Sequence, residues 1–196
     1  SGLVAGAGAP ESTDGTGPDG TVFLGNYIHD YCQNLTDSQQ HTTYFSNRSG
    51  TTYLPFEIGC NYLSNNMANH GIHIYDEGVC GGWSGTVKIH DNVVVDQRGI
   101  SIGVNPSCQI GYGPVTTTFD VYNNLVVNGG RGPYFLSNGG LWSVGIAFGT
   151  GNPFNDKVAD YTINVYNNTV YGTGETVRDI GNWSSQGALH INPLFR

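Results

Sequence analysis

The chain has 196 residues, of which only 11% are charged, and 15 Asp and Glu against 7 Lys and Arg give a formal net charge of -8. The acidic balance and the lack of a basic stripe disfavour a nucleic-acid partner, and we find no apolar stretch that predicts membrane insertion. The apolar residues and 30 glycines together are ordinary for a folded domain. We therefore expect one domain with a buried core.

Residues 1–20 are rich in Gly, Ala and Pro and contain two Asp-Gly steps. This composition predicts an N-terminal extension or a cap, followed by a repeat domain over residues 21–196. No signal peptide begins the chain. We interpret the sequence as a mature or trimmed segment with an uncovered last repeat.

One phrase occurs five times from residue 21 onward: an alternating apolar segment runs into asparagine and then into apolar residues again. The phrases are separated by 31 to 44 residues, a spacing that indicates stacked units. The anchoring asparagines are Asn26, Asn61, Asn92, Asn124 and Asn168.

The residues before each anchor alternate with a period of two, which predicts strands and not helices. Two rows are expected to point into the core. The row five residues before the anchor is Thr21, Phe56, Val87, Phe119 and Ile163, and the row three before it is Phe23, Ile58, Ile89, Val121 and Val165.

A second phrase, Gly-Ile-X-Ile or a close variant, begins at Gly71, Gly99 and Gly145, and more weakly at Gly187. It predicts at least one further strand in each coil. The first coil lacks it, because residues 33–50 read as a polar stretch.

These repeats resemble the right-handed parallel β-helix proteins of the pectate-lyase-like group. The resemblance implies an all-β, right-handed parallel β-helix of about five coils, with the anchoring asparagines aligned at one tight turn. Asparagine suits that turn because it tolerates the left-handed backbone conformation, and stacked amides can hydrogen-bond from coil to coil. The fold carries many functions, so the resemblance leaves activity open.

The four cysteines suggest one bridge and a weaker second one. Cys80 and Cys108 each lie nine residues after a Gly-Ile phrase, which predicts adjacent positions within disulfide reach. Cys32 and Cys60 form a weaker candidate pair, and four reduced thiols are the alternative. Bridges imply an oxidising compartment, so we expect a secreted, extracellular or cell-surface protein. Glycosylation sequons start at Asn34, Asn47, Asn167 and Asn182.

Catalytic candidates are few. Polysaccharide lyases and epimerases need a base and cationic groups beside a sugar carboxylate, and His73, Lys88, His90 and Arg98 are the available candidates. We expect His73, Lys88 and His90 to face solvent, because each is next to an inward isoleucine. The competing interpretation has more weight: Glu57, Lys88 and Asp120 occupy one outward row and form an alternating-charge ladder.

A second outward row places His90, Tyr122 and Tyr166 in successive coils. Such a strip suits sugar stacking or a protein contact, and it is equally an ordinary way to stiffen a sheet. The cysteine spacing fits no zinc motif. We therefore expect no metal or cofactor, except calcium if the protein acts on carbohydrate, where it would bridge an acidic protein and an acidic polymer.

Two functions from different classes remain. The first is a secreted structural solenoid that self-associates into a filament or surface layer, because open sheet ends are templates for further stacking. The second is a polysaccharide-active enzyme of the lyase or epimerase type, or a carbohydrate-binding module. The sequence favours the first, since it supplies interfaces more clearly than a catalytic set, and enzyme activity stays undecided.

Overall fold

The computed structural model describes residues 3–7, 21–33, 41–47, 56–75, 85–105, 116–130, 144–148, 160–172, 175–179 and 189–194. All the regular elements within these ranges are β-strands. No helix in the described part of the chain is long and apolar enough to cross a membrane.

The strands form three parallel sheets, which we call A, B and C. Sheet A contains β1 (Leu3–Ala7), β4 (His41–Asn47), β7 (His70–Tyr75), β10 (Ile100–Asn105), β13 (Val144–Phe148) and β16 (Glu175–Asp179). Sheet B contains β2 (Thr21–Leu24), β5 (Phe56–Gly59), β8 (Gly85–His90), β11 (Thr116–Tyr122), β14 (Asp160–Tyr166) and β17 (Leu189–Leu194). Sheet C contains β3 (Tyr27–His29), β6 (Tyr62–Ser64), β9 (Val93–Val95), β12 (Leu125–Val127) and β15 (Thr169–Tyr171).

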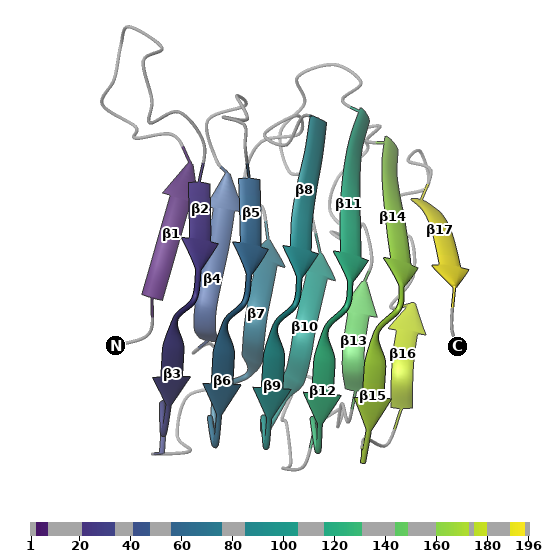
Figure 1. Cartoon of the computed structure of the whole chain (residues 1–196). Coiled ribbons are helices and arrows are strands. Elements are labelled where there is room, and N and C mark those ends of the chain that lie inside the picture. Colours follow the sequence, from purple (N-terminus) through teal and green to yellow (C-terminus); the bar gives the residue numbers. More distant parts are fainter. Residues whose placement is uncertain are drawn as a thin grey trace, which may run out of the picture.

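The chain visits the sheets in the fixed order A, B, C, and each strand pairs in parallel with the strand one coil away. Sheets B and C form one bent layer and sheet A forms the other (Figure 1). This arrangement is a parallel β-solenoid and confirms the predicted all-β class. Strand β1 lies within residues 1–20 and pairs with β4, so part of the predicted extension belongs to the stack.

The predicted inward rows of sheet B are confirmed by the strand register. Phe56 pairs with Val87 and Ile58 with Ile89, and the next two coils continue both rows. Their described members from Phe56 onward are at most 2% exposed. The core lies between the two layers, since the ring of Phe45 in sheet A is 6.0 Å from that of Phe56 in sheet B.

The asparagine ladder is also confirmed. The side-chain oxygen of Asn92 accepts hydrogen bonds from the backbone N–H (3.1 Å) and the side-chain amide (2.9 Å) of Asn61. Asn92 in turn donates to Asn124 in the same two ways and to the carbonyl of Ile58. The same pattern runs from Asn26 to Asn168.

The expected backbone conformation of these asparagines was wrong. Among the described residues, all the left-handed φ values except those of Cys32 and Gly130 belong to the residue before each ladder asparagine and to the residue four after it. Those positions are Gly25, Cys60, Asp91, Asn123 and Asn167, and Asp30, Asn65, Asp96, Asn128 and Gly172. The ladder residues are therefore selected for their side-chain amides, while their neighbours make the turns.

The second sequence phrase was aligned incorrectly at Gly99, and the weaker phrase at Gly187 was assigned to the wrong sheet, because its residues from Leu189 onward lie in β17 of sheet B. Ile72 pairs with Ile102, and Ile102 with Ile146, so Gly71 is level with Ser101 and not with Gly99. Cys80 and Cys108 were predicted to be level because each lies nine residues after a phrase glycine. Since Gly99 is two residues out of step with Gly71, that count no longer places the two cysteines at the same level. Both cysteines lie outside the described residues.

The segment between the first two asparagine phrases does contain a sheet A strand, contrary to the prediction. Strand β4 pairs with β7 in register, and Thr43 and Phe45 fill the inward positions. In β4 a short threonine-rich segment replaces the Gly-Ile phrase, so the recurring phrase does not mark this strand in the sequence.

The weaker cysteine pair is not joined in the structure, where Cys32 and Cys60 are both thiols. Cys60 lies at the corner between sheets B and C, and Cys32 follows the end of β3 in the previous coil. About five residues of extended chain separate the two corners, roughly 16 Å at strand spacing. That distance exceeds the roughly 7 Å limit between the Cα atoms of a disulfide.

Candidate metal centre

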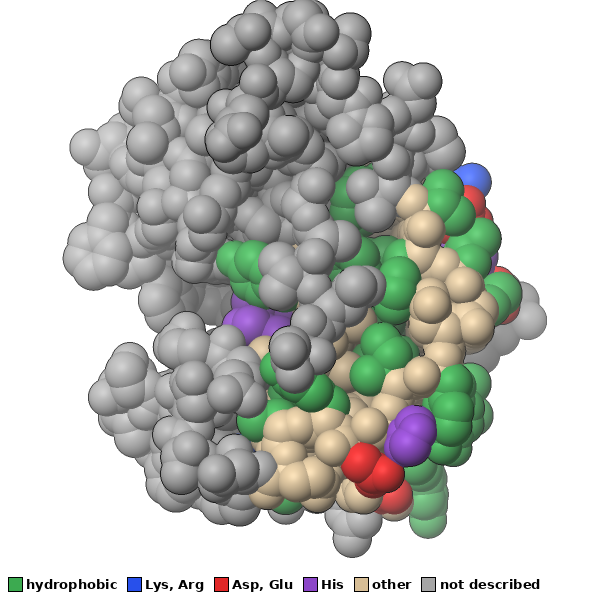
Figure 2. Space-filling view, turned by 90° about the vertical axis from the view of Figure 1, so that its left-hand side faces the viewer, with side chains coloured by type: hydrophobic (Ala, Val, Ile, Leu, Met, Phe, Trp, Pro, Cys, Tyr) green, Lys and Arg blue, Asp and Glu red, His purple; other side chains and the backbone are tan. Residues whose placement is uncertain are grey.

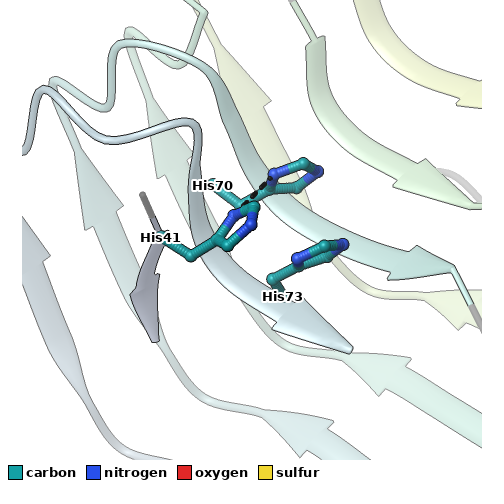
Figure 3. Close-up of side chains that lie close together, drawn as sticks. All are labelled: His41, His70 and His73. Atoms are coloured by element: carbon teal, nitrogen blue, oxygen red, sulfur yellow. Dashed lines mark hydrogen bonds between the residues drawn. The ribbon is translucent and has the colours of Figure 1, made fainter. Parts of the chain in front are cut away.

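Three histidines gather at the beginning of sheet A, where β4 and β7 start side by side (Figure 3). His41 and His70 are register partners, and their Nδ1 atoms are 3.1 Å apart. The His70 and His73 rings stack with centroids 3.9 Å apart, and the His73 ring centroid is 4.3 Å from that of His41. One ligand nitrogen from each histidine lies within 4.8 Å of the other two.

The local backbone places His70 and His73 on the same outer side of sheet A. A side-chain carbon added at Gly103, on the neighbouring strand, would lie 2.5 Å from the His70 ring and 3.5 Å from the His73 ring. The lack of a side chain there leaves room for the two imidazoles. The Tyr44 ring packs edge-on against His73 at 5.3 Å and completes the cluster.

His70 and His73 are each 6% exposed, while His41 is half-buried. Burial lowers the pKa of His70 and of His73 well below the ordinary imidazole value, and repulsion from neighbouring histidines lowers the pKa further. Both rings are therefore neutral at pH 7 and have a lone pair available. Neutral imidazoles are the usual nitrogen ligands of transition metals, and the three rings bring one nitrogen each within 4.8 Å of the others.

The four catalytic candidates do not share one groove. His73 lies on the outer side of sheet A, whereas Lys88 and His90 lie in β8 of sheet B, across the core. Arg98 lies at the corner between sheets C and A, is 7% exposed, and donates to the Met67 carbonyl. His73, Lys88 and His90 were expected to face solvent. Lys88 does, but the structure buries His73 in the histidine cluster and leaves His90 only 9% exposed.

His90 is held on both sides by carboxylates. Its Nε2 lies 2.7 Å from Glu57 Oε1 and its Nδ1 lies 2.7 Å from Asp91 Oδ2. The predicted row of Glu57, Lys88 and Asp120 is in register, but Glu57 contacts His90 and not Lys88. A histidine with both nitrogens engaged is a poor general base, so we assign His90 a structural role.

The aromatic row is confirmed as a continuous stack. His90 and Tyr122 are 5.0 Å apart and inclined by 10°, and Tyr122 and Tyr166 are 5.1 Å apart and inclined by 5°. Burial, followed by nearby negative charge, raises the pKa of both tyrosines. Because Tyr122 is covered on both faces by its neighbours, only its edge remains for a ligand, which favours the stiffening role over sugar stacking.

Only one glycosylation sequon has a described side chain. Asn167 is exposed at the corner between β14 and β15, where an attached glycan would project into solvent. Asn47 is the last residue of β4, and its side chain is not described. Asn34 and Asn182 lie outside the described residues. Glycosylation of all four stays a prediction.

The sequence did not reveal the histidine cluster. His41 lay in the segment interpreted as a polar stretch, and His70 precedes a phrase that we aligned with the wrong residue. The spacing of His70 and His73 gave no signal either, because side chains three residues apart on a regular strand point to opposite faces. The cluster becomes readable only once β4 is recognised as a strand.

Comparison with known proteins adds no further constraint. No protein family, no curated protein and no solved structure matches this chain.

Proposed function

We propose that this protein is a structural solenoid that assembles head to tail into filaments, outside the cell or at its surface. The observation that carries the proposal is that the end strands of all three sheets each have one edge with which no described strand pairs. In the described part of the chain, no strand pairs with the outer edges of β1, β2 and β3 at one end or of β16, β17 and β15 at the other. Such edges are templates for further parallel strands.

The two ends differ, which favours an open chain of copies over a closed dimer. Every strand pair is parallel, and each ladder asparagine before Asn168 donates its side-chain amide to the asparagine of the next coil. At the first coil, no described donor reaches the side-chain oxygen of Asn26. A polar stack with unlike ends makes heterologous contacts, which generate filaments when the rotation does not close.

The first coil also exposes apolar surface. Val22 is 54% exposed and Tyr27 64%, and the core residues Phe23 and Ile28 are only half-buried. Viewed from this end, hydrophobic side chains are spread across the described part of the face (Figure 2). Burial of this surface by a second copy would contribute free energy in proportion to the apolar area removed from water.

We further propose that the chain is related to the pectate-lyase-like group and that it winds as a right-handed solenoid of about five coils. Right-handed crossovers between parallel strands are strongly preferred, because right-handed strand twist favours them. The polysaccharide-active alternative, with its calcium requirement, has weaker support. Its candidate residues lie on different faces, and the faces of the aromatic strip are occupied.

Electron microscopy of the untagged protein at micromolar concentration tests the assembly. We expect filaments in the wild type and dispersed particles in the double variant Val22→Lys with Tyr27→Lys, because charged edge strands resist stacking. Leu125→Lys is the matched control, since Leu125 is 37% exposed on a strand inside sheet C. A wild type that stays monomeric at every concentration in sedimentation velocity would exclude assembly of this chain.

A further inference from the structure

We propose that His41, His70 and His73 form a binding site for one divalent transition-metal ion of the zinc class. The site lies on sheet A, away from the strand edges that the assembly uses. The inference therefore goes beyond the proposed assembly and does not depend on it.

The distances suit one ion. A tetrahedral zinc with bonds of about 2.0 to 2.1 Å holds neighbouring nitrogens about 3.3 Å apart. The Nδ1 atoms of His41 and His70 are already 3.1 Å apart. The widest separation within the trio is at most 4.8 Å, so side-chain movements of about 1 Å bring all three nitrogens into the coordination range.

The polar atoms of the cluster are not all accounted for by protein contacts. At most one of the two facing Nδ1 atoms of His41 and His70 carries a hydrogen if they bond to each other. The buried Nε2 of His70 has no hydrogen-bond partner among the described residues, although buried polar groups are normally paired. His70 can therefore offer either nitrogen to an ion, Nδ1 beside His41 or the unpartnered Nε2. A cation that binds one of them together with a nitrogen of His41 and of His73 gives a reason for three histidines to lie together here.

The ligand chemistry selects the class of ion. The trio offers three imidazole nitrogens and no carboxylate. Imidazole suits zinc, copper, nickel and cobalt, whereas calcium and magnesium prefer oxygen ligands.

Two features of the fold position the ligands. The parallel pairing of β4 with β7 sets His41 opposite His70, and the bare backbone at Gly103 leaves space for the rings of β7. Ligands from two adjacent strands of a sheet are held more precisely than ligands on loops. His41 is the most exposed of the three ligands.

The experiment is a titration of the metal-free protein with Co²⁺, followed by displacement with Zn²⁺. The titration uses the variant Val22→Lys with Tyr27→Lys, which should stay dispersed, so the result does not depend on whether the wild type forms filaments. We expect one Co²⁺ per chain, with visible bands of tetrahedral or five-coordinate cobalt and without the near-ultraviolet charge-transfer band of cobalt thiolate. Zn²⁺ should displace it, and Ca²⁺ and Mg²⁺ should not.

Two variants assign the ligands. His41→Ala removes the partly exposed ligand, and His73→Phe keeps an aromatic ring against His70 and Tyr44 while it removes the nitrogens. Each should weaken Co²⁺ binding by more than about 100-fold, beyond the loss caused by a merely supporting residue. His29→Ala is the matched control, because His29 is exposed in sheet C and contacts Asp30. It should leave the affinity within about twofold, since it supplies no ligand.

Circular dichroism and thermal melting without metal establish that each variant is folded. If the protein with all three histidines, in the Val22→Lys and Tyr27→Lys background, is folded and does not bind one Co²⁺ per chain, the proposal is overturned. The three histidines are then a packed imidazole cluster. Binding that persists in folded His41→Ala and His73→Phe also overturns it, because the ion would then lie elsewhere. A thiolate charge-transfer band would assign the ion to the cysteines and has the same consequence.

Discussion

The corner between sheets B and C and the beginning of sheet A are built on opposite rules. At the corner, five successive coils place the same residue, asparagine, at the same level, and each amide bonds the next. At the beginning of sheet A, the register column reads His41, His70 and Ile100. The first region repeats and the second changes from coil to coil.

This difference separates fold from site. A repeated residue satisfies a need that every coil shares, here the hydrogen-bonding groups of a buried turn. A residue found in only two coils satisfies no general need of the stack, so a local explanation is required. In a solenoid, candidate functional residues are therefore best sought where the repeat is broken.

The segment that leads into sheet A should tolerate an added side-chain carbon less well than the corner between sheets B and C. A side-chain carbon at Gly99 would lie 1.8 Å from the Asn69 carbonyl oxygen of the previous coil. Since backbone must move to relieve that contact, we expect Gly99→Ala to lower the free energy of unfolding by about 3 kcal/mol or more. Urea unfolding followed by circular dichroism measures the loss.

Gly25→Asn is the control for this change. Gly25 has a left-handed φ of 68° and no atom within 4 Å of an added side-chain carbon, and asparagine occupies the equivalent corner position at Asn123 and Asn167. Its stability should stay within about 0.5 kcal/mol of wild type. Equal stabilities for Gly99→Ala and Gly25→Asn would show that the coils at Gly99 are less closely spaced than described.

The ladder should depend on its interior members more than on its ends. Asn92→Ala removes the acceptor of two donors from Asn61 and the donor to the buried Ile58 carbonyl. We expect a loss of about 2 to 3 kcal/mol in urea unfolding, because buried polar groups are left unpaired. Asn26→Ala, at the half-buried first position, should cost about 1 kcal/mol, as for one ordinary hydrogen bond. Equal losses would contradict a cooperative interior ladder.

The smallest effect is expected where one coil departs from the corner rule. Cys60 has a φ of 55° and is exposed, while the other corners use glycine, aspartate or asparagine. Cys60→Asn should raise the free energy of unfolding by about 0.5 to 1 kcal/mol, a part of the left-handed penalty. Cys60→Ala keeps that penalty and serves as control. A loss of stability confined to oxidising conditions would instead reveal a bridge made by Cys60.

Much of the fold was readable from the sequence because it rests on local periodicity. The five asparagine phrases predicted the ladder, the two inward rows and the register of sheet B. Sheet A was harder, since β4 has threonine in place of the Gly-Ile phrase and the phrase at Gly99 is two residues out of step with those at Gly71 and Gly145. The register of sheet A is set by hydrogen bonds between coils and is not marked by a repeated sequence motif.

The candidate site was not readable for the same reason. The sequence by itself determined that Asn26, Asn61, Asn92, Asn124 and Asn168 would align, because identical residues at a nearly constant spacing stack when the coils do. Only the tertiary structure decided that His41 meets His70 and His73, because that contact depends on the pairing of β4 with β7. Strand pairing joins residues that are far apart in the chain, and a pattern of neighbours does not record it.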